Sequence, residues 1–405
     1  MPILVFLRKS ILFFPRRIFR LLKPLFKLLL FFIFTLLFFL VALLSRFKRK
    51  YNVGFGPEPL INNVHHKKAL LSNGIEAETF VTHCYYISNE FDIIIKGEFS
   101  YLFFIKLLLR YKAVFYYFNG GLLSFSYPRI TLLCSLEPFF LKLANIKTIL
   151  MPYGSDIQDF NVYNDVVYKN AYNSDYPQFL RKQFIKTEKR VKFWLKYADW
   201  VIAGCDWVNY LPYWDTLMLA HFSVDNKKWF PLEHNLPPKF NKERPLRILH
   251  APNHKAIKGT NFIEKNINEL ITEGYPIEYS LIQKVPNDQL VPIVQNADIV
   301  IDQLVIGWYG IFSLEVMSCK KPVLVYIKPE LERLYILSGL LDINELPFIK
   351  SDYDTLKDNI INILNNPSLV SDYGEKSFNY VNKHHSCEYV GKVFSDILIK
   401  LGCHN

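Results

Sequence analysis

The sequence predicts an α/β protein of two doubly wound domains that face a cleft, preceded by an N-terminal membrane-anchoring helix. Three observations carry this prediction. After residue 50, short apolar runs alternate with longer helical patterns, which is typical of βαβ units. A proline-rich stretch interrupts the alternation near the middle of the chain, and an uncharged apolar run lies near its start.

The composition limits the function classes. A length of 405 residues favours two domains, and a hydrophobic content of 51% excludes a disordered or fibrous chain. The net charge is +11, but residues 1–50 hold eleven Lys and Arg and no Asp or Glu. The remaining residues carry 37 bases and 37 acids, so the body is neutral. We therefore expect no nucleic-acid partner.

The N-terminal segment has the pattern of a membrane anchor. Residues 28–45 contain no charge, and as a helix they would span about 27 Å, close to the thickness of a bilayer core. Lys27 and Arg46 flank this run, and residues 3–27 alternate apolar patches with bases. A buried core helix and a cleaved signal peptide are the alternatives. We expect residues 1–50 to bind membrane lipid, as a single-pass or a monotopic element.

The cysteines and asparagines add two weaker indications. None of the six cysteines has CxxC or other metal-ligand spacing, which predicts buried free thiols and no metal. No Asn-x-Ser/Thr sequon with x other than Pro occurs, which disfavours a eukaryotic secretory lumen.

The first domain is predicted over 51–231. Most of its apolar runs give way to Gly, Asp or Ser, the residues that open loops at the carboxyl ends of strands, where ligands bind in open α/β sheets. Strands are predicted at 53–60, 76–81, 91–97, 113–121, 147–157 and 198–205.

The second domain repeats this plan over 246–368, after a proline-rich linker at 232–245. Residues 369–405 are predicted to form terminal helices that cross back to the first domain. Strands are predicted at 245–252, 277–283, 297–303, 321–327 and 346–350.

The densest group of polar residues is HAPNHKAIKGT (250–260), which follows the first strand of the second domain. His254, Lys255 and Lys258 share this loop, and Gly259 can open the next helix. Bases beside a helix N-terminus suit a phosphate group, because free backbone N–H groups and cations point the same way. A solvated basic loop is the alternative.

A second candidate element is DQLVIGWYGIFSLEVMSCKKPVL (302–324). Residues 311–319 are predicted to be a helix whose first amides, at Gly310, Ile311 and Phe312, would face a diphosphate. Glu315 lies one turn into this helix, where a carboxylate can accept two ribose hydroxyls. An ordinary exposed glutamate is the alternative. Trp308 and Tyr309 would either stack on a base or sugar or pack in the core.

These segments resemble the retaining, nucleotide-sugar-dependent glycosyltransferases of the GT-B type often called family 4, whose two Rossmann-like domains enclose the donor site. The resemblance spans about residues 51–400 and keeps its order. The matching segments are ADWVIAGCD, FSVDNKKWFP (222–231), PNHKAIKGT, the 297–324 block, which resembles the family's E-x7-E block, and LNNPSLVSDYGEKSFNYVNKHHSCE.

The resemblance implies roles for residues of the second domain, with two departures. Lys258 takes the place of the Lys that holds the donor diphosphate, and Glu315 that of the second Glu of the pair. No Arg stands in the basic loop, so Lys255 or His254 would supply the second cation. Gly307 stands where the first Glu belongs. Asp302 and Gln303 are its nearest polar substitutes.

In the first domain, GFGPEP (54–59) resembles the loop that closes over donor and acceptor, and Gly56 is its predicted donor contact. YGSDI (153–157) resembles a cleft loop in which Asp156 would bind an acceptor hydroxyl or help remove its proton. An Asx turn or helix cap is the alternative for Asp156. His221 is a further predicted donor contact. The predicted catalytic residues are thus Asp156, Lys258 and Glu315.

The resulting expectation is a membrane-associated retaining glycosyltransferase that uses a UDP- or GDP-linked sugar, with no cofactor and no metal. Its acceptor would be a lipid-linked or surface glycan, and it could assemble with other glycan-synthesis enzymes. The positive-inside count, seven bases before residues 28–45 and four after, places the body outside, whereas nucleotide sugars are made in the cytosol. We expect the cytosolic face. Two alternatives stay open: a lapsed GT-B scaffold subunit, and a nucleotide-sugar epimerase or hydrolase.

Overall fold

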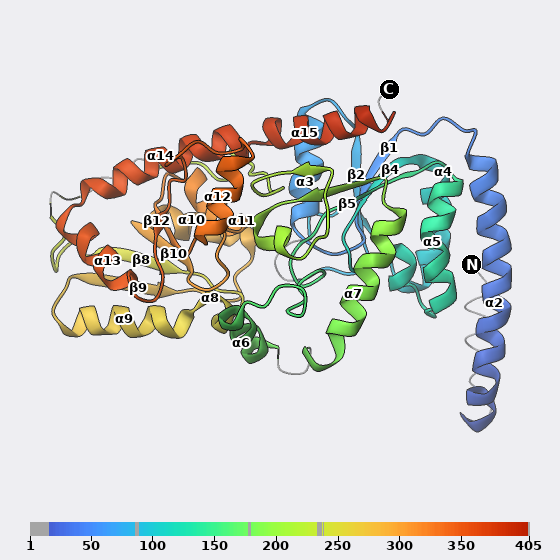
Figure 1. Cartoon of the computed structure of the whole chain (residues 1–405), viewed down its shortest axis with the longest axis horizontal. Helices are drawn as coiled ribbons and strands as arrows, with labels where there is room; N and C mark the ends of the chain where they lie inside the picture. Colours follow the sequence, from blue (N-terminus) through green and yellow to red (C-terminus); the bar gives the residue numbers. More distant parts are fainter. Residues whose placement is uncertain (1–15, 86–88, 177–179, 233–236, 238, 404–405) are drawn as a thin grey trace.

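Two parallel β-sheets stand side by side in the computed structural model, which describes residues 16–85, 89–176, 180–232, 237 and 239–403 (Figure 1). The first sheet has the order β3-β2-β1-β4-β5-β6-β7 and the second the order β12-β11-β10-β8-β9. The predicted α/β architecture is therefore confirmed. The first-sheet strands are β1 (Asn52–Phe55), β2 (Ala77–Val81), β3 (Ile93–Ile94), β4 (Tyr111–Tyr116), β5 (Lys147–Leu150), β6 (Trp200–Ala203) and β7 (Thr216–Leu217). Those of the second are β8 (Leu246–His250), β9 (Ile277–Leu281), β10 (Ile299–Gln303), β11 (Val323–Val325) and β12 (Ile349–Lys350).

The eleven predicted strand segments each overlap an observed strand, but one differs in character. Residues 91–97 were expected to form a buried strand, whereas β3 has two residues and Ile94 is 55% exposed. The reason is position, because β3 lies at the edge of its sheet. The two-residue strand β7 is too short for its sequence to carry a periodic signal.

Helices connect the strands and cover the sheets (Figure 1). In the first domain they are α3 (Asn62–Ser72), α4 (Ser100–Arg110), α5 (Thr131–Leu143), α6 (Val166–Asp175) and α7 (Leu180–Tyr197). In the second they are α8 (Lys255–Lys258), α9 (Thr260–Thr272), α10 (Asn287–Asn296), α11 (Ile311–Ser318), α12 (Pro329–Leu337) and α13 (Leu356–Asn365). The single predicted terminal helical region is two helices, α14 (Ser368–His384) and α15 (Cys387–Lys400).

The last helix returns to the first domain. Figure 1 shows α14 and α15 running along the top of both sheets, with α15 against α3. Val390 and Phe394 of α15 share a buried apolar cluster with Val53 and Phe55 of β1. A Cβ at Gly391 would collide with the backbone carbonyl of Ala69, so only glycine permits this close approach.

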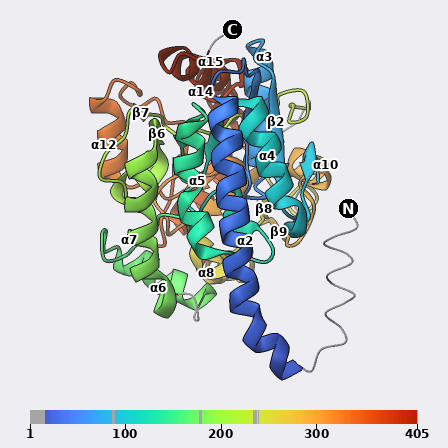
Figure 2. The same ribbon diagram turned by 90° about the vertical axis from the view of Figure 1, so that its right-hand side faces the viewer.

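The N-terminal helix α2 (Arg16–Ser45) lies lengthwise against α4 and α5 (Figure 2). One stripe of it is buried: Phe38 and Ala42 are inaccessible to solvent. Phe38 makes edge contacts with Phe104 of α4 and Phe140 of α5, at centroid distances of 4.9 and 5.7 Å. The helix is therefore part of the first domain's core packing.

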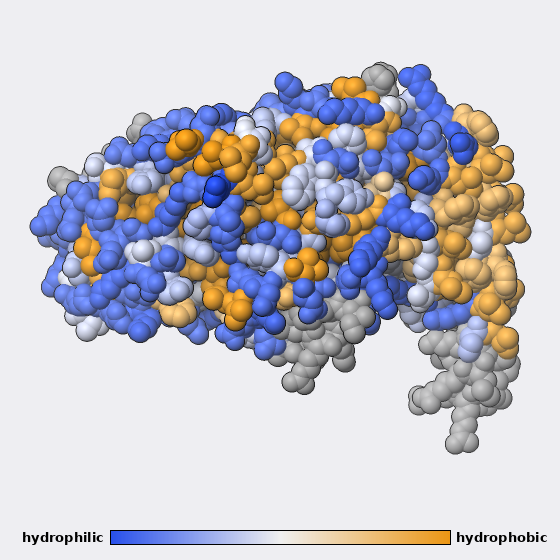
Figure 3. Space-filling view, viewed as in Figure 1, coloured by the Kyte–Doolittle hydropathy of each residue, from blue (hydrophilic) through white to orange (hydrophobic). Residues whose placement is uncertain are grey.

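The opposite face of α2 is apolar and exposed to solvent, and it is seen as the orange surface at the right-hand end of the molecule in Figure 3. Phe32 is 61% and Leu44 68% exposed, and Leu102 of α4 and Leu132 of α5, on the helices against which α2 packs, are also exposed. Residues 24–45 are long and apolar enough to cross a membrane. A lipid-surrounded span, however, would require α4 and α5 to enter the bilayer with it.

Parts of the predicted segments lie outside the described residues. These are residues 1–15 of the basic N-terminal segment, and 233–236 and 238 of the predicted linker.

Because α2 is packed by one stripe only, two phenylalanines of that helix should behave differently. We expect Phe38→Ala to lower the free energy of unfolding by about 3 kcal/mol, since it opens a cavity between α2, α4 and α5. Phe32→Ala, on the exposed face, should change it by less than about 0.5 kcal/mol. Denaturant unfolding of the full chain in detergent measures both. Equal effects of the two substitutions would show that α2 does not pack on the body.

Candidate functional site

The carboxyl edges of the two sheets meet at the domain interface. In each sheet all strands are parallel. The loops after β1, β4 and β5 therefore gather at the carboxyl edge of the first sheet, and the loops after β8 and β10 gather at the carboxyl edge of the second sheet. A direct contact crosses the interface: Nε2 of His65, on α3, lies 3.9 Å from Oε1 of Glu315, on α11. This is the edge at which open α/β sheets bind ligands.

Three polar side chains, from α8, β10 and α11, contact one another near the carboxyl ends of β8 and β10. Lys258 Nζ lies 2.5 Å from Asp302 Oδ1, and Ser313 donates its hydroxyl to Asp302 Oδ2 at 2.5 Å. Burial raises the pKa of Asp302, but the Lys258 cation and the Ser313 hydrogen bond outweigh it and hold that pKa below its usual value. Lys258 thus stands where the resemblance places a diphosphate cation, already paired with a carboxylate.

The basic loop itself folds as the single helical turn α8. Lys255, at its start, is exposed and is the most accessible cation of the loop. Gly259, with φ of +77°, reverses the chain between α8 and α9, so that α9 begins at Thr260. The helix start predicted after Gly259 is confirmed. His250, by contrast, is buried between the carbonyl of Ile301 and the hydroxyl of Thr260, at 2.8 and 2.9 Å.

Helix α6 of the first domain covers this loop. The Asp175 carboxylate accepts the backbone N–H groups of Ala256 and Ile257, at 3.3 and 2.9 Å. The Tyr176 hydroxyl lies 2.5 Å from Nε2 of His254. A carboxylate thus occupies the amides at the start of α8, next to the basic loop, whereas the helix start predicted to face a phosphate is that of α9 after Gly259.

The other end of α6 is tied to the second domain at Gly307. Asp165 caps α6 by accepting the N–H of Tyr168 at 2.8 Å, and its second oxygen lies 2.6 Å from Lys328 Nζ. Gly307 has φ of +94°, and a Cβ there would collide with the side chain of Lys328. A glutamate at Gly307 would therefore adopt a strained backbone conformation and require the Lys328 side chain to move. We call Asp165, Asp175, Tyr176 and Lys328 the α6 clasp.

The start of α11 is the part of the second domain that best matches its prediction. Gly310, Ile311 and Phe312 open the helix and are partly exposed. A Cβ at Gly310 would meet no atom within 4 Å, so a ligand can approach the backbone there. Lone N–H groups at a helix start are suited to an anion.

Glu315 is buried rather than open to a ribose. Its side chain is 2% exposed, and Oε1 accepts the amide of Asn287 at 2.8 Å. Burial raises its pKa to about 7. Both ring nitrogens of His65, beside it, have no hydrogen-bond partner among the described residues. This pair of polar groups is incompletely satisfied, as at a site that a ligand completes.

Three predicted donor contacts, Gln303, His221 and Gly56, are engaged with backbone groups of the described residues. Gln303 accepts the N–H groups of Val305 and Ile306 at 2.9 and 2.7 Å, which shapes the loop before Gly307. His221 is buried, with Nε2 2.6 Å from the carbonyl oxygen of Pro152. Gly56 packs against the carbonyl of Phe80, which a Cβ would strike. Their roles in donor binding remain predictions.

Trp308 and Tyr309 follow the packing alternative. Trp308 is 1% exposed and donates its indole N–H to the carbonyl of Leu219 at 2.9 Å. The Tyr309 hydroxyl lies 2.7 Å from that of Tyr380, on α14. Trp308 thus connects the two domains, and Tyr309 fixes α14 to the start of α11.

Asp156 takes the geometry of a turn residue. Its Oδ1 accepts the N–H groups of Tyr153 and Gly154, both at 3.0 Å, and Oδ2 that of Phe118 at 3.1 Å. Burial raises its pKa to about 7. This carboxylate holds together the loops after β4 and β5, and its predicted role toward an acceptor remains untested.

Glu58 was not predicted as a site residue, although it stands in the motif GFGPEP (54–59). Glu58 Oε1 accepts the amide of Asn119 at 2.7 Å and the hydroxyl of Tyr153 at 3.2 Å. Its buried Oε2 has no hydrogen-bond partner among the described residues. Burial raises the pKa of Glu58. A glutamate between two prolines at a strand end was the available signal.

Among the residues that the structure describes, no group of three or more His, Cys, Asp or Glu side chains is placed to hold a metal ion.

Comparison with known proteins identifies the fold. No protein-family model matches the chain, and no curated protein matches its sequence. Sucrose-phosphate synthase from Thermosynechococcus elongatus is similar in structure, with a TM-score of 0.52 and 13% identity over 87% of this chain and 99% of that one. A glycosyltransferase from Rickettsia africae ESF-5 has a TM-score of 0.51 and 15% identity, over 88% and 100%. The chain therefore has the GT-B fold.

The buried Glu315 gives the site a measurable pH dependence. Its folded pKa of about 7 lies above the ordinary value of 4.5, so between these pH values the folded state binds the proton more tightly. The protonation of Glu315 therefore stabilises the folded state at low pH, and this contribution to the free energy of unfolding should be lost as pH rises from about 4.5 to 7. In Glu315→Gln this loss is absent, and the difference between the two unfolding curves should change steadily across that window. Parallel curves would contradict the raised pKa.

Proposed function

We propose that the chain is a membrane-associated retaining glycosyltransferase. It transfers a sugar from a nucleoside diphosphate to a hydroxyl of a lipid-linked or surface glycan. The observation that carries the proposal is the placement of Lys255, Lys258 and the open start of α11 on one sheet edge, facing the polar loops of the other. This arrangement occurs in a fold shared with a sucrose-phosphate synthase and a glycosyltransferase.

The second domain supplies leaving-group stabilisation. As the glycosidic bond breaks, negative charge grows on the diphosphate. Lys255 and the amides of Gly310 and Ile311 are positioned to neutralise it, and Lys258 adds a second cation once it is shared with the ligand. No proton transfer to the diphosphate is needed, because a diphosphate leaves as an anion.

The first domain would receive the acceptor. The unpartnered Oε2 of Glu58 can accept the proton of an incoming hydroxyl, while Asn119 and Tyr153 hold the other oxygen in place. In a retaining reaction this hydroxyl approaches from the face that the diphosphate leaves. Asp156 acts indirectly, because it accepts the N–H of Tyr153 and so fixes the loop that carries this residue.

The α6 clasp determines access. Asp175 occupies the α8 amides, and Asp165 holds Lys328 beside Gly307. A donor diphosphate must displace the Asp175 carboxylate or bind on the α11 side of it. In the first case binding is coupled to movement of α6, which contacts both domains.

Helix α2 favours a monotopic association with the membrane. Its Phe38 stripe is packed on α4 and α5, while its other face is apolar and exposed. A helix lying in the membrane interface buries such a face without crossing the bilayer. The positive-inside count then does not apply, and the cleft stays on the cytosolic side, where nucleotide sugars are made. A lipid-borne acceptor held in the same plane gains effective concentration.

One observation favours a second candidate, a scaffold subunit whose active site has lapsed. Gly307 and Lys328 replace the glutamate that the resemblance places near the donor sugar, and Asp302 already pairs with Lys258. Such a subunit would bind a nucleotide without turnover, or bind none. A nucleotide-sugar epimerase or hydrolase has less support, because a soluble substrate gives no reason for the apolar face of α2.

Two lysines of the basic loop separate ligand binding from folding. Lys255→Ala should weaken binding of the nucleotide sugar about tenfold, as expected for loss of one charge-assisted hydrogen bond, and leave the melting temperature unchanged. Lys258→Ala should weaken binding and also lower the melting temperature, because Asp302 becomes an unpaired buried carboxylate. Calorimetric titration and thermal unfolding measure the two effects. Lys265→Ala, an exposed change on α9, is the matched control. Unchanged affinity in Lys255→Ala would contradict the proposed diphosphate site.

Glu58 should act on transfer and not on donor binding. Glu58→Gln keeps the shape of the side chain and the acceptor for Asn119, but removes the charge at Oε2. We expect turnover to fall about a hundredfold while donor affinity stays within about twofold. Glycosyl transfer assayed with the identified donor, alongside donor titration, measures both. If Glu58→Gln weakened donor binding but left turnover at saturating donor unchanged, Glu58 would be a donor contact instead.

A further inference from the structure

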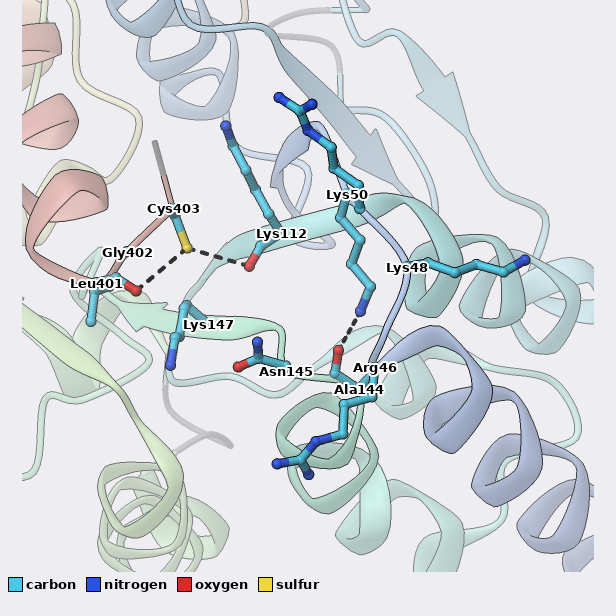
Figure 4. A pocket seen from close by; sticks show the side chains of 11 residues that line it. Arg46, Lys48, Lys50, Lys112, Ala144, Asn145, Lys147, Leu401, Gly402 and Cys403 are labelled. Carbon is cyan, nitrogen blue, oxygen red and sulfur yellow. Dashed lines mark hydrogen bonds between the residues drawn. The ribbon is translucent and has the colours of Figure 1, made fainter. Parts of the chain in front are cut away.

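A basic cavity lies on the side of the first sheet opposite the cleft. Its volume is about 310 Å³, and it is formed where the amino ends of β1, β4 and β5 meet the end of α2 and the end of α15 (Figure 4). We call it the basic pocket. It is lined by Arg46, Lys48, Arg49, Lys50, Lys112, Ala144, Asn145, Lys147, Leu401, Gly402 and Cys403.

The lining is strongly unbalanced in charge. Six of the eleven lining residues are Lys or Arg, and none of those described is Asp or Glu. Asp199 acts electrostatically on Cys403, but its carboxylate accepts the N–H of Thr148 at 2.9 Å and does not line the cavity. The six cations come from the α2–β1 connection and two strands, and no acidic side chain among the described lining residues neutralises them, so the cavity favours an anion.

The position of one of these cations is fixed by the fold. Lys50 donates to the carbonyl of Ala144, the C-cap residue that follows α5, so its ammonium is held at the negative end of a helix (Figure 4). Burial lowers the pKa of Lys50 to about 8. Burial also lowers the pKa of Lys112, and the Arg49 cation adds to this. These are partly desolvated cations inside a cavity, where an anion is bound more strongly than on an open surface.

The pocket is separate from the proposed transfer site. The strands that frame it are parallel, so their amino ends are at the edge away from Glu58, Asp156 and the second domain. A donor bound in the cleft cannot supply the anion. The pocket adjoins α2 instead: Leu44 and Phe47, 68% and 85% exposed, immediately precede Lys48, Arg49 and Lys50.

We propose that the basic pocket is a binding site for a phosphate-bearing group, supplied by the headgroup of an anionic lipid. The exposed face of α2 lies among the acyl chains, and the headgroup of a lipid at the end of α2 enters the pocket. Basic residues at the margin of an interfacial helix are attracted to anionic lipids in this way. The inference rests on the membrane association proposed above, but not on the transfer reaction.

Paired substitutions distinguish a defined pocket from general attraction by surface charge. Lys112→Gln/Lys147→Gln removes two pocket cations on β4 and β5 without altering α2. Lys106→Gln/Lys142→Gln removes two charges from α4 and α5, the helices that flank α2, outside the pocket. The full-length proteins are transferred from detergent to vesicles of phosphatidylcholine, with or without phosphatidylglycerol, and partitioning is measured by flotation.

We expect the pocket variant to bind the phosphatidylglycerol vesicles at least about tenfold more weakly than the unaltered chain, since each cation near an anionic surface contributes about 1 kcal/mol. In the control variant, the logarithm of the affinity for these vesicles should fall by less than half as much as in the pocket variant. Neither variant should change binding to pure phosphatidylcholine. Equal losses in the two variants would overturn the proposal, because they would show delocalised attraction. So would an unaltered affinity in the pocket variant.

A second measurement identifies the source of the phosphate. Inorganic pyrophosphate is added to the detergent-solubilised chain carrying Lys255→Ala, which weakens the cleft, with and without the pocket substitutions. Stabilisation that needs the pocket lysines, together with pocket-dependent vesicle binding, supports the lipid assignment. Pocket-dependent stabilisation without any effect on vesicles would overturn it in favour of a soluble phosphate compound. Neither assay uses glycosyl transfer, so failure here is distinguishable from failure of the proposed function.

Discussion

The packing of α15 on α3 is the constraint on which the rest of the molecule depends. Because Gly391 lets the backbone of α15 reach the carbonyl of Ala69, the end of the chain belongs to the first domain although it follows the second. The chain therefore passes between the domains twice, once before β8 and once at Ser386. This double connection holds the carboxyl edges of both sheets face to face, and every proposed contact with donor and acceptor lies at that interface.

The polar groups at the interface are largely engaged with one another. Lys258 pairs with Asp302, and the α6 clasp brings Asp165 to Lys328 and Asp175 to the amides of α8. Burial of charge is tolerated only with such partners, so the closed arrangement is self-consistent without a ligand. Among the exceptions are Glu58 Oε2 and the two ring nitrogens of His65, which have no hydrogen-bond partner among the described residues. They stand on the first-domain side, where an acceptor and a donor would meet.

The sequence predicted what local pattern determines. Apolar runs ending in Gly, Asp or Ser located the strands, and the glycines at 259 and 310 located the starts of α9 and α11. It did not predict the burial of Glu315, because that depends on the neighbouring His65 and Asn287, distant in sequence. The α6 clasp was missed for the same reason: nothing local tells that Asp175 caps a helix in another domain. The apolar run of α2 was recognised, but an apolar pattern alone does not show that Phe38 packs on protein and Phe32 faces outward.

The central claim is that the cleft binds a nucleotide sugar, and ligand-dependent stability tests it most directly. The full chain in detergent is unfolded by heat in the presence of UDP, GDP, ADP or CMP and their common sugar conjugates. A ligand at about a hundred times its dissociation constant adds roughly 2.7 kcal/mol to the stability of the folded state. The account predicts a raised melting temperature with one nucleotide, and loss of most of that increase in Lys255→Ala. No increase with any nucleotide would contradict it.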